Sequence, residues 1–199
     1  MSFYSIVKNI VSALIPFVYR VKVEGTENIP KDKGYILCCN HISFMDPVIL
    51  IAKVKDQCHF MGKIELFRNP FLSYIFRSLG AFPVDRGKGD TGAVDHAVQL
   101  VKDNKVFAIF PEGTRSKTGE LGRLKSGAVV IASRTGGDIL PCVIKKGSRR
   151  FLRRTVTLKF GSVIKNSSLG IDGTSHSQIK SATRLLTKSF ESLLEDIND

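Results

Sequence analysis

The chain has 199 residues, of which 43% are hydrophobic and 24% are charged. A single domain is the default at this length, and both fractions lie near globular averages, which disfavours disordered, collagenous and polytopic membrane proteins. The 30 Lys and Arg residues outnumber the 18 Asp and Glu residues, for a net charge of +12. That excess indicates an anionic partner, such as nucleic acid, an anionic membrane surface or a phosphorylated substrate.

The cysteines give no sign of a disulfide framework or a metal site. Cys38, Cys39, Cys58 and Cys142 form no CxxC pair and have no regular spacing, which disfavours both features and fits a reduced, cytosolic interior. No set of Asp, Glu and His residues follows the spacing of metal ligands either, so we expect no metal.

The N-terminal segment predicts an amphipathic helix, because apolar residues recur at steps of four and three: Phe3, Val7, Ile10, Leu14 and Phe17. Its uncharged part is far shorter than the roughly 20 residues that a spanning helix needs. It also lacks the cleavage site of a signal peptide. The helix could pack on the core or lie in a membrane interface, and Pro16 should kink it or end it.

Beyond this helix, short β-rich runs alternate with helical periods. Strands are expected over 21–23, 35–39, 58–61, 81–84, 106–110, 139–144 and 155–160. Helices are expected over 93–101, 128–132 and 179–197. This alternation predicts an α/β fold, a sheet covered by helices on both faces. We interpret the Gly- and Ser-rich stretch 161–177 as a loop into the last helix.

The first candidate site is the segment 40–47, Asn-His-Ile-Ser-Phe-Met-Asp-Pro, at the end of a predicted strand and the start of a helix. Sites in α/β folds lie at such strand ends. His41 and Asp46 are five residues apart, so a turn could bring the carboxylate onto one imidazole nitrogen and leave the other to accept a proton. The alternative is a capping Asp46 and a buried structural histidine.

The second candidate site is the segment 110–116, Phe-Pro-Glu-Gly-Thr-Arg-Ser, directly after another predicted strand. A Gly-Thr-Arg turn presents backbone N–H groups, a hydroxyl and a guanidinium, which together suit a phosphate. An ordinary β-turn is the alternative. Lys63, Arg86 and Lys125 are further basic candidates, each of which alone would be a solvated surface charge.

Together these segments resemble the glycerophosphate acyltransferase family, most closely its 1-acylglycerol-3-phosphate acyltransferases. The segment 40–47 matches the family's NHxSxxDP block, 63–86 is similar to its second block, 110–116 matches FPEGTRS, and 139–141 is similar to the fourth. The resemblance implies a mixed sheet flanked by helices, in an acyltransferase domain over 21–199. The amphipathic helix over 1–20 precedes it and is expected to associate with a membrane, although it is shorter than the membrane-attaching segment of many family members. Leu124 stands where the family often has an aromatic residue.

The resemblance also implies the chemistry. His41 would be the general base, oriented by Asp46, and the glycerophosphate site would comprise Arg86, Glu112, Gly113, Thr114 and Arg115, with Lys63 and Lys125 as helpers. The acyl group would pass from acyl-CoA or an acyl carrier protein to the sn-2 hydroxyl of lysophosphatidic acid, without a cofactor. The protein would then work peripherally at the cytoplasmic face of an anionic membrane. Glycerol 3-phosphate or another lysophospholipid is the alternative acceptor.

Two features suggest other functions. Residues 87–92 match G-x-G-x-x-G and Glu112 follows about 20 residues later, as in a dinucleotide site, but the turn is charged and Glu112 belongs to the more specific FPEGTRS match. A basic run could bind nucleic acid, although no stacking aromatic series accompanies it: Lys145, Lys146, Arg149, Arg150, Arg153 and Arg154. We therefore expect no nucleic-acid partner. A G-x-S-x-G elbow is absent, which excludes an α/β-hydrolase.

Overall fold

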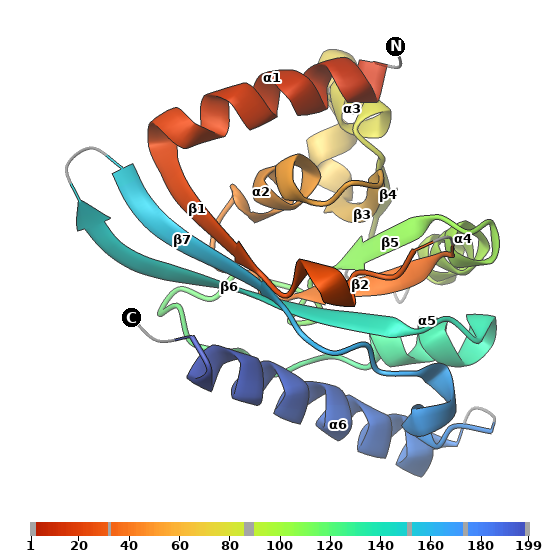
Figure 1. The fold of residues 1–199 in the computed structure, drawn as a ribbon. Helices are drawn as coiled ribbons and strands as arrows, with labels where there is room; N and C mark the ends of the chain where they lie inside the picture. Colours follow the sequence, from red (N-terminus) through yellow and green to blue (C-terminus); the bar gives the residue numbers. More distant parts are fainter. Residues whose placement is uncertain (1–2, 32, 86–89, 151–152, 173–174, 198–199) are drawn as a thin grey trace.

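The computed structural model describes residues 3–31, 33–85, 90–150, 153–172 and 175–197. Seven strands form one mixed sheet in the order β1-β7-β6-β2-β5-β3-β4, in which only β6 and β7 pair antiparallel (Figure 1). This arrangement confirms the predicted fold class. The strands are β1 (Tyr19–Glu24), β2 (Tyr35–Cys39), β3 (Cys58–Lys63), β4 (Ala81–Val84), β5 (Val106–Ile109), β6 (Ile139–Arg150) and β7 (Arg153–Phe160).

Helices cover both faces of the sheet (Figure 1). The helices are α1 (Phe3–Val18), α2 (Asp46–Lys53), α3 (Pro70–Ser78), α4 (Thr91–Lys102), α5 (Gly127–Thr135) and α6 (His176–Glu195). Short 3-10 turns are η1 (Thr26–Asn28), η2 (Ile64–Phe67) and η3 (Asn166–Leu169). The helices α1 and α2 lie on one face, and α4, α5 and α6 lie on the other.

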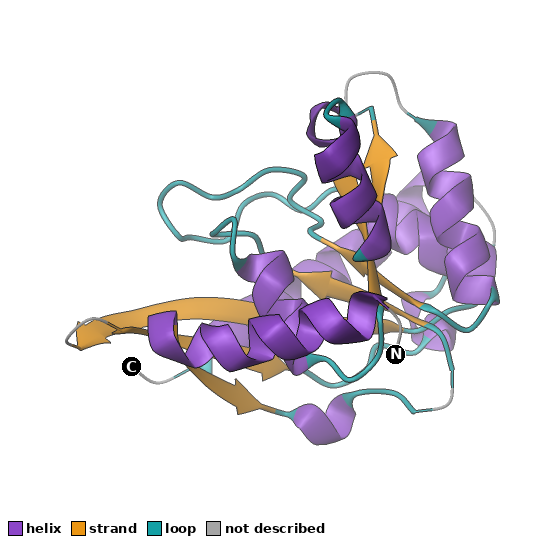
Figure 2. Ribbon diagram, turned by 90° about the horizontal axis from the view of Figure 1, so that it is seen from above, coloured by secondary structure: helices purple, strands orange, loops and turns teal. Residues whose placement is uncertain are grey.

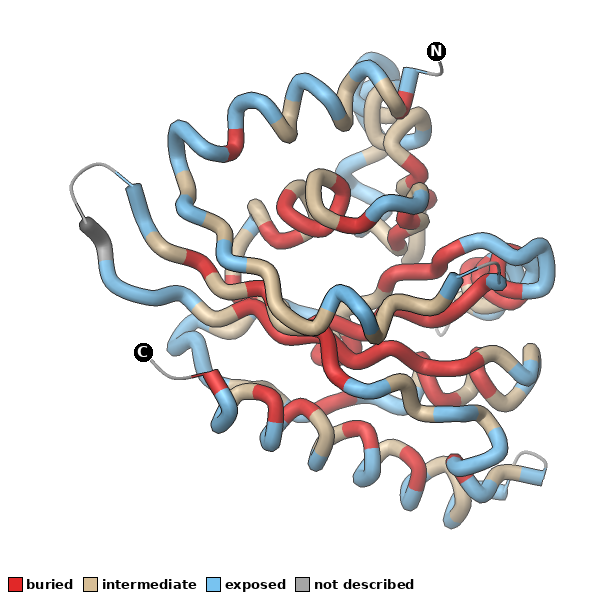
Figure 3. The backbone as a smooth tube through the Cα atoms, in the orientation of Figure 1, coloured by how far each residue is buried: buried red, intermediate tan, exposed pale blue. Residues whose placement is uncertain are grey.

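The centre of the sheet explains why its strands are continuous apolar runs. Every residue of β2 is buried (Figure 3). Ile36 and Cys38 belong to the core under α4, α5 and α6, whereas Tyr35, Leu37 and Cys39 belong to the core under α1 and α2. A strand buried on both faces needs apolar residues at successive positions, not at alternate ones.

The structure differs from the predicted elements in a few places. Pro16 does not end α1, which continues to Val18 before β1 begins. The strand β5 ends at Ile109, one residue earlier than expected, and β6 runs to Arg150 instead of stopping at 144. The helix α3 was not predicted. It begins at Pro70 after Asn69, whose side-chain oxygen caps the first turn.

The parallel strands bring the two candidate segments together. Neighbouring strands β2 and β5 run in the same direction, with Cys38 opposite Ile109, so the chains that leave them emerge at one edge of the sheet. The helices, strands and loops are seen from above in Figure 2. The carboxyl edge of such a sheet is the usual location of a site. The segments 40–47 and 110–116 both start at this edge.

Candidate active site

The predicted contact between His41 and Asp46 is present. Asp46 is the first residue of α2, and its Oδ2 lies 2.8 Å from His41 Nδ1. The same oxygen accepts the backbone N–H groups of Ile42 and Ser43, each at 2.7 Å. The Asp46 carboxylate is fully buried, and the imidazole is 14% exposed. A carboxylate held in this way at a helix N-terminus is also favoured by the helix dipole.

The surroundings of the imidazole set its tautomer as well as its position. Because Nδ1–H donates to the carboxylate, the network assigns the tautomer in which Nε2 can accept a proton. Phe110 stacks on the ring with centroids 4.1 Å apart and an interplanar angle of 19°. The imidazole thus forms a hydrogen bond to a carboxylate and stacks on an aromatic plane.

The chain that follows β5 holds the backbone of His41 from both sides. Glu112 Oε1 accepts the N–H of His41 at 2.7 Å, and the N–H of Ser116 donates to the carbonyl of His41 at 2.7 Å. Glu112 Oε2 accepts the N–H of Gly122 at 2.9 Å, and a Cβ at Gly122 would lie 2.7 Å from that oxygen. Glu112 was predicted among the phosphate residues, but both of its oxygens hold backbone amides here, and a carboxylate would repel a phosphate.

The strand β6 supports the same segment from the other side. The side-chain amide of Asn40 forms two hydrogen bonds with the backbone of Ile144, at 2.7 and 3.0 Å. Lys146 Nζ donates to the carbonyl of Ile42 at 2.9 Å. Asn40 was not predicted to have a role of its own, and Lys146 was predicted only as part of the basic run. The signal for Asn40 was its place at the head of the motif, directly after a buried strand.

Four of the residues predicted at the phosphate site lie together in and beside the turn that follows β5. Gly113 has a left-handed φ of 72°, which favours glycine, and a Cβ there would lie 2.8 Å from Lys125 Nζ. The backbone N–H of Lys125 donates to the carbonyl of Pro111 at 2.8 Å. Thr114 and Arg115 follow in the same turn, and the Arg115 guanidinium lies 3.4 Å from the centroid of the Phe44 ring.

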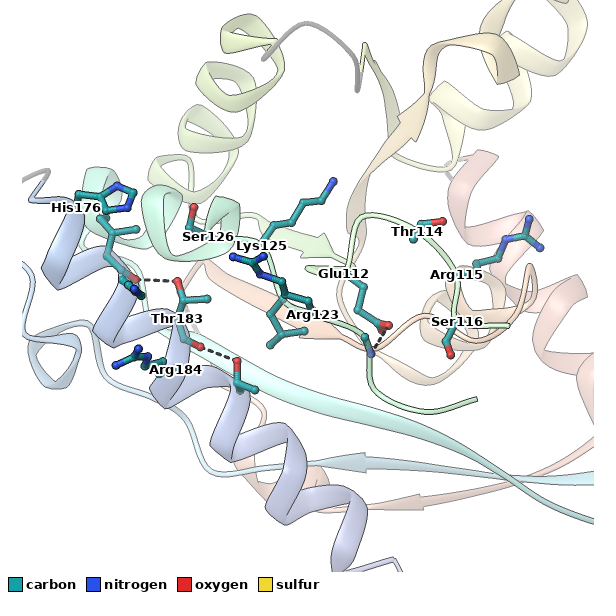
Figure 4. A pocket seen from close by; sticks show the side chains of 15 residues that line it. Glu112, Thr114, Arg115, Ser116, Arg123, Lys125, Ser126, His176, Thr183 and Arg184 are labelled. Atoms are coloured by element: carbon teal, nitrogen blue, oxygen red, sulfur yellow. Dashed lines mark hydrogen bonds between the residues drawn. The ribbon is translucent and has the colours of Figure 1, made fainter. Parts of the chain in front are cut away.

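A cleft of about 930 Å³ opens between this turn and α6 (Figure 4). Thr114, Arg115, Ser116 and Lys125 line it on one side, and residues of α6 line it on the other. Ser116, which lines the cleft, donates its backbone N–H to the carbonyl of His41. The cationic cleft therefore adjoins the backbone of His41, although the His41 side chain is not among the residues that line it.

Comparison with known proteins agrees with this geometry. The profile of the Acyltransferase family matches residues 20–145. The chain belongs to this family. The match confirms the resemblance seen in the sequence, and it spans both segments that meet at His41.

Related acyltransferases carry more specific names. A 1-acyl-sn-glycerol-3-phosphate acyltransferase of Bacillus subtilis is 33% identical over 139 residues, which is 69% of each chain. The protein of that name in Borreliella burgdorferi is 31% identical over 69% of this chain and 56% of its own length. The crystal structure of the 1-acyl-sn-glycerophosphate (LPA) acyltransferase of Thermotoga maritima gives a TM-score of 0.75 at 26% identity, covering 98% of this chain and 81% of that one.

Lys63 and Arg86 are the other basic residues predicted at the site of this acyltransferase. Lys63, at the end of β3, pairs with Glu65 at 2.9 Å and does not line the cleft. Arg86 and the glycines at 87 and 89 lie outside the described residues. At the start of α4, the Asp90 carboxylate accepts the N–H groups of Ala93 and Asp85, at 3.0 and 3.1 Å. A side-chain carboxylate thus occupies the helix N-terminus that a dinucleotide would need.

Proposed function

We propose that this acyltransferase transfers a fatty acyl group from a thioester to the sn-2 hydroxyl of 1-acyl-sn-glycerol 3-phosphate, which yields phosphatidic acid. The observation that carries the proposal is the His41–Asp46 pair, with its second imidazole nitrogen available, beside the turn that bears Arg115 and Lys125. The names of the Bacillus and Thermotoga relatives support the same reaction.

The reaction follows from what the pair can do. His41 Nε2 takes the proton of the sn-2 hydroxyl while its oxygen attacks the thioester carbonyl carbon. When the tetrahedral intermediate collapses, the carbon–sulfur bond breaks and the imidazolium returns the proton to the thiolate. Asp46 keeps Nδ1 protonated and stabilises the imidazolium. General-base help contributes about 10²–10⁴-fold, and fixed alignment of the two reactants supplies much of the rest.

The acceptor phosphate is assigned to the turn at Arg115. A guanidinium forms two parallel hydrogen bonds to a phosphate, and Lys125 adds a second positive charge at the same turn. The exposed Thr114 hydroxyl completes this phosphate site. The N–H of Gly113 instead donates to the carbonyl of Phe110 at 2.9 Å and so closes the turn. The Arg115 guanidinium lies over the ring of Phe44. This contact orients the guanidinium plane before a phosphate binds.

The lipid substrate is proposed to arrive through an apolar surface on α1 and α3. The predicted stripe of α1 does not face the core: Phe3, Ile10, Leu14 and Phe17 are exposed by 41–76% (Figure 3). On the opposite side, α1 packs through Tyr4 and Ile15, and Lys8 donates to the carbonyl of Val54, the residue that follows α2. The helix therefore has two apolar faces, one for the core and one available to a membrane interface.

The same surface extends to α3, because the rings of Phe3 and Tyr74 are 5.9 Å apart and Phe71 is 70% exposed. None of the described helices is long and apolar enough to cross a membrane. Arg153, in the basic run, donates to the carbonyl of Pro16 at 3.3 Å, so positive charge lies beside the end of α1. An apolar helix face flanked by cations suits the surface of an anionic leaflet, which we take to be the cytoplasmic one.

The substitution His41→Ala tests the proposed function. With lysophosphatidic acid and a thioester donor, kcat should fall by about 10²–10⁴-fold while the thermal unfolding transition is retained. His96→Ala is the matched control, because His96 is exposed on α4 and contacts Phe82 away from the cleft. Glycerol 3-phosphate and other lysophospholipids belong in the same acceptor panel. Near-normal turnover of His41→Ala would refute the assignment of the base.

A further inference from the structure

We infer that the end of the cleft formed by α6 binds the 3′-phosphoadenosine diphosphate part of coenzyme A, so that acyl-CoA is the donor. The inference rests on the proposed function, since the bound thioester would be delivered to His41. It adds a second anion site to the cleft, separate from the acceptor phosphate at Arg115. The residues that define it are Arg123, Lys180 and Arg184.

The charge of the cleft exceeds what one phosphate needs. Five cationic side chains line it: Arg115, Arg123, Lys125, Lys180 and Arg184. The only carboxylate in the lining is Glu112, and both of its oxygens are held by backbone amides. Within the described part of the chain, the exposed side chains of Arg123, Lys180 and Arg184 form no ion pair or hydrogen bond. This surplus fits a ligand with several phosphate groups, such as a pyrophosphate with a 3′-phosphate.

The remaining lining suits a nucleoside better than a second lipid head. Thr183 and Thr187 donate their hydroxyl groups to the carbonyls of Ile179 and Thr183, at 2.7 and 2.9 Å (Figure 4), so these hydroxyl protons are not available to a ligand. Half-buried Ile179 and buried Leu124 add apolar surface. Guanidinium planes such as that of Arg123 also stack on flat rings. Cations around an apolar floor match an adenosine that carries phosphates.

The volume and the position favour the donor over the acceptor. A space of about 930 Å³ is at the upper end of small-ligand sites, which are about 300–1,000 Å³. The helix α6 lies on the face of the sheet opposite α1 (Figure 1). A lipid acceptor that enters from the apolar surface on α1 and a water-soluble donor that enters along α6 would meet near Ser116, which lines the cleft and donates its N–H to the carbonyl of His41.

A concave site distinguishes coenzyme A from an acyl carrier protein. A nucleotide fits inside the cleft, whereas a folded carrier protein would contact its rim. The first test measures binding without turnover, by calorimetric titration of the full chain with adenosine 3′,5′-bisphosphate and with coenzyme A. We expect saturable binding that weakens as salt is raised. No binding of either compound to the wild-type chain would overturn the inference.

Variants then locate the site. The double substitution Lys180→Ala with Arg184→Ala should raise the Kd of coenzyme A about tenfold or more. Lys188→Ala is the matched control, because Lys188 is exposed on the same helix, one turn further on, and does not line the cleft. Its Kd should stay near that of the wild type. Equal weakening by the control would show that only the overall charge of α6 matters, and the site would be withdrawn.

Kinetics separate this inference from the proposed function. The double variant should raise the KM of acyl-CoA about tenfold, with the KM of lysophosphatidic acid unchanged. The penalty should nearly vanish with S-acyl-N-acetylcysteamine, a thioester without the nucleotide. Equal loss with both thioesters, or a loss found only with acyl carrier protein as donor, would overturn the nucleotide site. If the proposed function itself is wrong, no donor will acylate lysophosphatidic acid, whatever the binding titrations show.

Discussion

The carboxylate of Glu112 accepts the backbone N–H of His41 at 2.7 Å. A side chain from the turn after β5 therefore holds the backbone of His41, the residue proposed as the base. His41 follows the neighbouring strand β2. The other oxygen of Glu112 accepts the N–H of Gly122 at 2.9 Å. Because both partners are N–H donors, each of the two terminal atoms of the side chain at position 112 must accept a hydrogen bond. A carboxylate provides two acceptors, whereas an amide provides only one.

Glu112→Gln should therefore lower kcat with little change in the KM of lysophosphatidic acid. The amide must turn its NH2 toward one backbone N–H, and leaving that buried donor unpaired costs about 1–3 kcal/mol. We expect a kcat about 10–100-fold lower and a reduced unfolding temperature, measured by steady-state kinetics and thermal denaturation. A raised KM with normal kcat would instead place Glu112 at the acceptor phosphate, as the sequence resemblance implied.

The parts of the fold that could be predicted are those whose burial leaves a local pattern. The β2 and β4 boundaries were predicted to the residue because both strands are short apolar runs with polar or glycine neighbours. The helix α3 could not be found in this way. No residue of α3 is buried, and Phe71 and Tyr74 are 70% and 63% exposed. The largest apolar side chains of this segment therefore do not mark the face that meets the rest of the protein.

In the site, too, local contacts could be predicted from the sequence, whereas contacts between distant segments could not. The contact between His41 and Asp46 spans five residues, so a turn at the strand end suffices to predict it. The roles of Glu112 and Asn40 depend on β2 lying between β5 and β6. Strand order is a property of the whole sheet that no spacing in one segment reveals. The cationic residues of α6 were missed for a related reason, since Lys180 and Arg184 meet the cleft only after α6 crosses the sheet.

Direct transfer predicts that no acyl group becomes attached to Cys39, the thiol nearest to His41 in the sequence. Cys39 is 1% exposed and packs toward α1 and α2. Burial, with the neighbouring Cys142 and Asp46, raises the pKa of the Cys39 thiol well above its usual value, which keeps it protonated and unreactive. Cys39→Ala should retain most activity. Mass spectrometry after incubation with the donor should find no acylated Cys39, and its detection would refute direct transfer.

The two-faced helix α1 predicts how membrane binding can be weakened without unfolding the protein. Removal of the whole helix would also expose the core under Tyr4 and Ile15, so point substitutions are cleaner. Leu14→Glu with Phe17→Glu changes side chains that are 58% and 76% exposed. Each one buried in a lipid interface would contribute about 1.5–3 kcal/mol.

Sedimentation with vesicles that contain phosphatidylglycerol should therefore show a large loss of binding for this double variant. Activity on acceptor dispersed in detergent should fall much less. Asn9→Glu is the matched control, because it adds a negative charge on the same helix at an exposed polar position and removes no apolar surface. Unchanged vesicle binding of the double variant would show that the outer face of α1 does not meet the membrane.

The assignment of the acceptor phosphate to Arg115 can be isolated by changing enzyme and substrate together. A charge-assisted hydrogen bond contributes about 1.5–3 kcal/mol, so Arg115→Ala should lower kcat/KM for lysophosphatidic acid about 10–150-fold. Arg115→Lys should recover only part of this, because an ammonium keeps the charge but not the planar fork that lies over Phe44. Lys117→Ala is the control, since Lys117 is exposed in the same loop and does not line the cleft.

The penalty at Arg115 must depend on the acceptor if the contact is made to its phosphate. Monoacylglycerol has the hydroxyls but no phosphate, so the wild-type enzyme should use it poorly and Arg115→Ala should use it no worse. The two enzymes and two acceptors form a cycle that cancels any general effect of the substitution on folding or on the base. Equal losses on both acceptors would mean that Arg115 orders the loop through Phe44 or binds the donor, and the acceptor phosphate would have to be placed elsewhere in the cleft.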